Sequence, residues 1–204
     1  MYIPPKYQLK DEPTIVNYIR QYPFATLITM GQDAPIATHL PFIIEEDEGQ
    51  WYLLGHMAKA NPQWQALPEQ QALIIFQEPH AYISPSYYDK EENVPTWNYV
   101  AVHVYGQTTL LLEEEQAIEV LEKSMHVFEK SFLSQWNNLR IEYKQRLLKG
   151  MVAFKLKIER WQGKEKLSQN KTLTEQQTIA EGLSHSNDNS ARELGQIMKD
   201  KLQS

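Results

Sequence analysis

The sequence predicts a mainly β protein with α-helices, arranged as a small closed or split antiparallel barrel with helical caps. Short strand signals recur at hairpin spacing between residues 24 and 112, and a strict apolar–polar alternation returns at 152–158. The chain has 204 residues, 42% of them apolar and 23% charged, which is the balance of one soluble globular domain with an appendage. We therefore expect a barrel domain over residues 1–172 and a helical tail over 173–204.

The N-terminal part predicts one short helix followed by a hairpin. Asp11 caps the helix and Pro23 ends it, and its apolar stripe consists of Ile15, Tyr18, Ile19 and Tyr22. Two β-rich segments follow at 24–29 and 35–44 with a turn between them, so they should pair as antiparallel strands.

The middle of the chain predicts further strands and one short helix. Asn61 followed by Pro62 is a helix-start signal, because Asn caps well and Pro suits the first helical position, so a helix should cover 63–67. In the strand expected at 96–112, valines alternate with Ala101, His103 and Tyr105, which is the period of a β-strand. The expected strands are 51–54, 72–77, 80–83 and 96–112.

The remaining segments predict two amphipathic helices, a strand and a helical tail. The helices are expected at 113–132 and 136–149, the second ended by Gly150. The strand 152–158 turns its lysines outward. From Thr172 the chain is polar and helical, with a break at 184–190 before a terminal helix.

Composition excludes several classes of protein. The absence of cysteine rules out disulfides, thiolate metal sites and Cys nucleophiles. No apolar run approaches the roughly 18–20 residues of a membrane span. Residues 1–7 lack the apolar region of a signal peptide. We therefore expect a cytoplasmic protein without a membrane partner.

The charge is unevenly distributed along the chain. Between Arg140 and Lys171, ten Lys and Arg stand against three Glu, so this basic span carries +7 and the rest of the chain −13, for a total of −6. An acidic field of that size does not favour DNA as a partner, although the basic span could hold one anionic ligand. A solvated helix face followed by the outward face of a strand explains the span equally well.

Familiar catalytic and nucleotide-binding signatures are absent, among them G-x-G-x-x-G, the P-loop, G-x-S-x-G and H-E-x-x-H. Four histidines lie on or beside expected strands, but no two are spaced as metal ligands within one element. These are His39, His56, His80 and His103. We therefore expect hydrogen-bonded, half-buried histidines and no metal site.

One polar segment is a candidate anion site. It places His56, Lys59 and the helix start at Asn61 just after a strand. Backbone N–H groups at a helix start favour an anion such as a phosphate, and Lys59 adds positive charge. Ordinary Asn-Pro capping of a short helix is the simpler explanation.

Two further segments could line a ligand site. Residues 92–99 put a Trp, an amide and a phenol in a row, which could hold a flat ligand or merely pack the core. Residues 166–171 offer two cations, a hydroxyl and two amides after the last strand, as a plain loop or as the rim of a site.

In their order along the chain, these segments resemble the PaiB-type FMN-binding negative transcriptional regulators. The resemblance runs from residue 1 to about 172. It rests on MYIPPKY at 1–7, FATLIT at 24–29, PIATHLP at 35–41, GH at 55–56 with NPQW at 61–64, FQEPHAYIS at 76–84, VPTWNY at 94–99, VHVYG at 102–106 and KLSQN at 166–170.

The resemblance implies an FMN-binding split β-barrel with flanking helices, related to the pyridoxamine-phosphate oxidase and flavin reductase barrels. It also implies a homodimer with FMN held between the subunits. Carried over by position, the cofactor-binding residues are Thr38, His39 and Leu40 on the flavin-side strand, His56, Lys59 and Asn61 facing the phosphate, and Trp97, Asn98, Tyr99, Lys166, Ser168 and Gln169 closing the site, some from the other chain. The arginine-rich phosphate cradle of the oxidases is missing, so weak FMN affinity is expected, and no catalytic residue can be placed.

Three functions are compatible with the sequence. The resemblance implies a repressor of transcription that acts as an FMN-binding dimer, although no helix-turn-helix stands out. A flavin-dependent oxidoreductase would take its redox chemistry from FMN. A haem-binding split barrel would use a histidine such as His39 or His103 as axial ligand.

Overall fold

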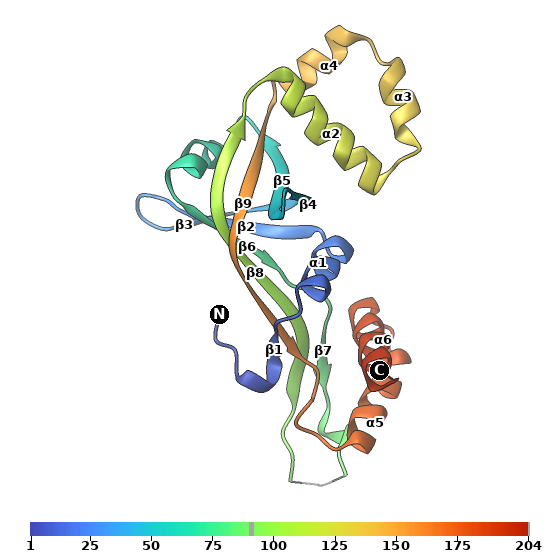
Figure 1. Ribbon diagram of the computed structural model, residues 1–204. Helices are drawn as coiled ribbons and strands as arrows, with labels where there is room; N and C mark the ends of the chain where they lie inside the picture. Colours follow the sequence, from blue (N-terminus) through green and yellow to red (C-terminus); the bar gives the residue numbers. More distant parts are fainter. Residues whose placement is uncertain (90–91, 204) are drawn as a thin grey trace. The chain divides into compact units, whose positions relative to one another are not determined.

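The fold comes from a computed structural model, which describes residues 1–89 and 92–203. The chain divides into two compact units. Unit 1 comprises Met1–Ile15, Gln77–Val102 and Gln162–Ser204, and unit 2 comprises Val16–Phe76 and His103–Trp161. Two long strands, β8 (Thr96–Leu111) and β9 (Met151–Lys166), contribute residues to both units (Figure 1).

Unit 2 contains most of the antiparallel sheet, with strand order β3-β2-β6-β8-β9-β5-β4. The expected hairpin is confirmed, since Thr26 on one strand lies opposite His39 on the other. On the other side of the sheet, Gly55 lies opposite Phe154. The strands besides β8 and β9 are β2 (Phe24–Met30), β3 (Pro35–Pro41), β4 (Ile43–Asp47), β5 (Gln50–Ala58) and β6 (Gln71–Phe76).

The expected single strand at 35–44 is wrong, because the chain changes pairing partner at Phe42. β3 pairs with β2, whereas β4 pairs with β5. Pro41 has no N–H to continue a ladder, and the Phe42 N–H donates to the Pro23 carbonyl at 2.9 Å. The Phe42 ring is fully buried, with its centroid 6.0 Å from that of Phe76 and 6.1 Å from that of Phe154.

The helices after β8 also depart from expectation. A single helix at 136–149 is wrong, since the segment forms α3 (Phe132–Asn138) and α4 (Ile141–Leu148). Leu139 is extended between them, and its N–H closes α3 on the Trp136 carbonyl at 3.1 Å. The buried Trp136 indole donates to Glu122 at 2.9 Å, which ties α3 to α2 (Glu114–Phe128).

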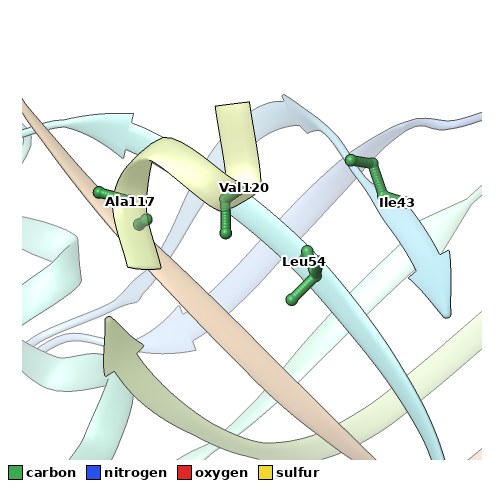
Figure 2. Packing of buried hydrophobic residues seen from close by; sticks show 5 residues of the cluster. Ile43, Leu54, Ala117 and Val120 are labelled. Carbon is green, nitrogen blue, oxygen red and sulfur yellow. The ribbon is translucent and has the colours of Figure 1, made fainter. Parts of the chain in front are cut away.

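A small apolar cluster joins α2 to the sheet (Figure 2). Ala117 and Val120 on α2 face Leu54 on β5 and Ile43 on β4, with Ala153 of β9 beside them. The apolar side expected from the sequence was Ile118, Leu121, Met125 and Phe128, but the first three are half-buried and Phe128 is 47% exposed. The face that packs on the sheet therefore begins one position earlier, at Ala117 and Val120. At the margin, the Lys123 ammonium donates to the Glu45 carboxylate at 2.6 Å.

Unit 1 combines short strands with the C-terminal helices. β1 pairs with β9, and β7 pairs with β8 so that Tyr82 lies opposite Trp97. The helical tail and its break are confirmed, and its second helix packs against its first and against β7. The elements here are η1 (Pro5–Tyr7), β1 (Gln8–Leu9), β7 (His80–Ile83), η3 (Pro85–Tyr87), α5 (Leu173–Ser184) and α6 (Asn189–Gln203). The domain boundary at 172/173 stays a prediction.

Helix ends in this fold follow the sequence closely. The Asp11 carboxylate accepts the Thr14 N–H at 2.9 Å and so caps α1 (Glu12–Gln21). Thr172 and Glu175 form a reciprocal capping box at the start of α5. Over the described residues, no helix combines the length and apolarity that crossing a membrane would require.

Candidate functional site

The first group of predicted site residues meets where β3 lies beside the start of η2 (Pro62–Glu69), a 3₁₀ helix in unit 2. The predicted cap is confirmed, because Asn61 Oδ1 accepts the Gln63 N–H at 3.1 Å. The same side chain donates from Nδ2 to Thr38 Oγ1 at 2.9 Å. The predicted flavin-side strand and the predicted phosphate-side segment are therefore hydrogen bonded to each other.

Gln63 completes the contact between β3 and the start of η2, and it was not among the residues predicted from the sequence. Its side chain is 1% exposed, and its Oε1 accepts from the Thr38 hydroxyl at 2.5 Å. Its Nε2 donates to Thr29 Oγ1 at 3.0 Å and to the Ile36 carbonyl at 3.1 Å. The available signal was an amide on a short helix whose inner face must be buried.

Lys59 is held by its backbone and has an exposed side chain. Its N–H donates to the Gly150 carbonyl at 2.9 Å, and its carbonyl accepts the Trp64 indole N–H at 3.0 Å. None of the carboxylates that the structure describes lies within ion-pair distance of its ammonium. A fixed backbone with an uncommitted ammonium group is suited to an anionic ligand.

The other predicted residues of this group differ in accessibility. His39 is exposed, with Nδ1 3.0 Å from Thr26 Oγ1 and its ring stacked on Phe24. His56 is partly buried, and burial lowers the pKa of its imidazole. Leu40 is buried, so only its backbone could face a ligand.

The second group lies in unit 1, where β8 contacts the loop after β9. Asn98 is 0% exposed, and its Nδ2 donates to Ser168 Oγ at 2.9 Å. The buried Ser168 hydroxyl in turn donates to Asn98 Oδ1 at 3.2 Å, and Ser168 adopts a φ of 62°. This reciprocal contact fixes a left-handed turn that few non-glycine residues adopt.

Two neighbours of that pair, Lys166 and Gln169, are also engaged in hydrogen bonds. The Lys166 ammonium donates to Thr96 Oγ1 and to the Trp97 carbonyl. Burial lowers the pKa of this ammonium, and the nearby charges of Lys164 and Lys6 lower it further. Gln169 closes the loop from both ends, accepting from Leu167 N–H and donating to the Glu165 carbonyl, each at 2.8 Å.

Trp97 and Tyr99 present the accessible surface of this second group. Trp97 is 53% exposed and stands 6.0 Å, ring centre to ring centre, from both His80 and Tyr82. Tyr99 is partly buried, with the Lys164 ammonium 5.1 Å from its ring centre. Exposed aromatic faces of this kind suit stacking on a flat ligand.

His103 and His80 each have a buried Nδ1 without a hydrogen-bond partner among the described residues, although His80 Nδ1 lies 3.3 Å from the Glu78 carboxylate. In the described part of the chain His103 has no such neighbour, and burial lowers the pKa of its ring. Among residues 1–89 and 92–203, no group of three His, Asp or Glu side chains could hold a metal ion.

The twelve predicted residues thus form two groups, one in each unit, and neither group includes a carboxylate. Hydroxyl, amide, ammonium and aromatic groups bind a flat anionic molecule well, and His39 and His56 are the two groups among the twelve that could act as a general base. The arrangement is suited to holding a cofactor, and any redox chemistry would belong to that cofactor.

The strand order and the helices around the sheet define the class as the split-barrel proteins that include flavin-binding members. The chain belongs to the family described as "Putative FMN-binding domain", whose model matches residues 1–160. It is 39% identical over 206 residues to the protease synthase and sporulation protein PAI 2 of Bacillus subtilis strain 168, covering 99% of this chain and 98% of that protein.

Solved structures show the same fold at low sequence identity. The flavocytochrome Anf3 from Azotobacter vinelandii matches with a TM-score of 0.62 and 19% identity, over 78% of this chain and 69% of that one. An FAD and haem binding protein from Mycobacterium smegmatis matches with a TM-score of 0.61 and 17% identity, over 78% and 73% of the chains.

Proposed function

We propose that this protein binds FMN, acts as a cytoplasmic homodimer and lowers transcription of target genes. The observation that supports the cofactor best is the hydrogen-bonded set of Thr38, Asn61 and Gln63, together with Lys59, which stands two residues before Asn61 and forms no ion pair within the described residues. It joins the strand and the helix start that the resemblance assigns to the flavin. The family description supports FMN rather than another flavin.

Titration of the purified protein with FMN and with riboflavin tests the cofactor. Lys59→Ala should weaken FMN binding about tenfold, the value of one charge-assisted contact of about 1.4 kcal/mol, because the phosphate loses its cation. Riboflavin has no phosphate, so its affinity should hardly change. Lys130→Ala, which removes an exposed cation elsewhere, is the control. Equal weakening of both ligands would assign Lys59 a structural role.

The regulatory role is supported by the relative rather than by the site. The name of the B. subtilis relative links that protein to protease synthesis and sporulation, and it covers nearly all of this chain. Transcript levels in a deletion strain test the role: loss of the gene should raise a set of transcripts, and unchanged transcripts would contradict it.

A haem-binding function is the second candidate, because His103 Nδ1 is buried without a partner within the described ranges. Both solved relatives above are named for haem as well as flavin, or as a flavocytochrome. An absorbance spectrum of freshly purified protein separates the two cofactors, since a Soret band marks haem and the flavin bands mark FMN. Turnover of NADH by flavin-loaded protein would favour an oxidoreductase.

A further inference from the structure

Unit 2 contains a cavity of about 440 Å³ that the twelve predicted residues, Lys59 apart, do not line. It lies among η2, α2, α4 and the ends of β8 and β9. Most of its wall is apolar, formed by residues such as Leu111, Ala117, Leu148 and Met151. Its volume falls in the range of small-molecule sites, roughly 300–1,000 Å³.

The polar lining of the cavity carries a net positive charge. Lys59 and Lys149 line it together with one carboxylate, Glu114. The Lys59 N–H donates to the Gly150 carbonyl at 2.9 Å, so the backbones that carry the two lysines are hydrogen bonded next to each other. Within the part of the chain that the structure describes, neither ammonium forms an ion pair.

Apolar side chains continue to the mouth of the cavity. Leu112 is 71% exposed and lines the same space. The helix side of the wall is firmly built, because Ala117 belongs to the cluster that packs α2 on the sheet (Figure 2). The cavity therefore combines a rigid apolar wall with two cations that have no internal partner.

We propose that this cavity binds a small amphipathic monoanion, an apolar chain or ring that carries one carboxylate. The apolar part would cover Leu111, Leu148 and Met151, and the carboxylate would lie between Lys59 and Lys149. Two lysines against one glutamate suit a single negative charge. Such a ligand would contact α2, α4 and β9 together, which gives a regulator a place to sense a metabolite in a cavity that shares only Lys59 with the proposed flavin site.

Calorimetric titration of the full-length protein with decanoate tests the site. Decanoate should bind saturably, decan-1-ol about tenfold more weakly because it lacks the charge, and decylamine more weakly still. Octanoate should bind about tenfold more weakly than decanoate, because two buried methylenes are lost. Absence of saturable decanoate binding would overturn the proposal.

Variants locate the ligand within the cavity. Lys149→Met should weaken decanoate about tenfold and leave decan-1-ol unchanged, whereas Lys130→Met should change neither. Ala117→Phe should fill the cavity and abolish binding of both. Leu112→Ser, at an exposed position that carries little folding risk, should weaken both if Ala117→Phe does not fold. If neither Lys149→Met nor Leu112→Ser changed the affinity for decanoate, the proposed site would be refuted.

A competition experiment separates this ligand from the flavin, with which it shares Lys59. Because the FMN phosphate would occupy Lys59, saturating FMN should weaken decanoate binding about tenfold, and Lys149 and the apolar wall should still hold the ligand. Complete displacement of decanoate by FMN, together with weaker FMN binding in Leu112→Ser, would assign the cavity to the flavin and overturn the proposal. If FMN failed to bind at all, the cofactor proposal would fall while the decanoate titrations still decided this one.

Discussion

Gly106 lies on β8 at a point where β9 passes too close for any side chain. A Cβ added there would lie 2.0 Å from the Lys157 carbonyl oxygen and 2.7 Å from a Leu156 methyl group. Because the nearest atom belongs to the backbone, the clash cannot be relieved by a rotamer change. Gly106→Ala should therefore cost about 2–3 kcal/mol of stability and lower Tm by about 5–10 °C in a thermal scan.

Gly150→Ala is the matched control for that substitution. A Cβ at Gly150 would meet the Leu147 carbonyl oxygen at 3.4 Å, which is an ordinary contact. Its Tm should stay close to that of the parent protein. Equal Tm values for the Gly106→Ala variant and the parent would mean that the two strands are further apart at this point.

His56 makes stability depend on pH through its burial. Burial lowers the pKa of the folded imidazole below its ordinary value of 6.5. As pH falls through that value, the unfolded chain binds a proton that the folded protein does not, so the free energy of unfolding falls. Between about pH 7.5 and 5.5, His56→Gln should lose less stability than the parent protein in urea titrations.

The control for His56 is an exposed histidine on α2. His126→Gln should leave the pH dependence of the parent protein unchanged. The titrations should use flavin-free protein, because His56 is among the proposed cofactor residues. If His56→Gln and the parent lost stability in parallel, the imidazole would not be buried in the folded protein.

At the scale of elements, the Asn61 side chain makes two hydrogen bonds, one to η2 and one to β3, and substitutions can separate their effects. Its Oδ1 caps η2, and its Nδ2 holds Thr38 on β3. Asn61→Asp keeps the cap and loses the donor, whereas Asn61→Ala loses both. Urea titrations should rank stability as parent, then Asp, then Ala, with the Ala variant about 1–2 kcal/mol below the parent. An Asp variant no more stable than the Ala variant would contradict a working cap.

Element identity followed well from local signals, because the forces that set it are local. The Asp11 cap, the Asn61 cap and the tail helices all rest on side chain–backbone contacts within a few residues. The hairpin of β2 and β3 followed from alternation and a turn for the same reason.

What the sequence could not supply were the effects of distant partners. The strand 35–44 divides because Phe42 is drawn into the core against Phe76 and Phe154. The helix at 136–149 divides because Trp136 is anchored on Glu122 of another helix. Gln63 escaped notice as a site residue because its partners come from two strands that precede it by some thirty residues.

At the scale of the whole molecule, we expect a homodimer. Unit 2 leaves Phe24, Met30 and Ile36 exposed on β2 and β3, and β3 ends the hydrogen-bonded strand order. Unit 1 leaves Trp97 exposed as well. Apolar surface of this kind on neighbouring strands commonly marks an interface between subunits. Light scattering should give twice the 23.9 kDa chain mass at micromolar concentration, and a monomer would remove the basis for a site shared between subunits.

The charge of the protein does not favour direct contact with DNA, although the proposed role is the regulation of transcription. The basic span carries +7 against −13 for the rest of the chain. Several of its cations are already engaged: Lys155 with Glu45 and Asp47, Arg160 over the Tyr105 ring, and Lys171 with Asn93. Lys144 and Arg146 of α4 also lie over aromatic rings, those of Trp136 and Tyr143. Within the described residues, the exposed Arg140, Lys149 and Lys157 form no ion pair or ring contact and remain free for phosphates.

Gel shifts with promoter DNA should therefore show weak, sequence-blind binding that disappears as salt rises, because few phosphate contacts are available. Reversing the charges of Lys144, Arg146 and Lys149 should abolish even this binding, while Lys155→Glu should have less effect because that ammonium already faces two carboxylates. The protein would then regulate transcription indirectly, by acting on another molecule, and not by binding DNA itself. A sequence-specific shift at nanomolar protein would contradict this expectation and favour direct repression, with α4 as the element in contact with the DNA.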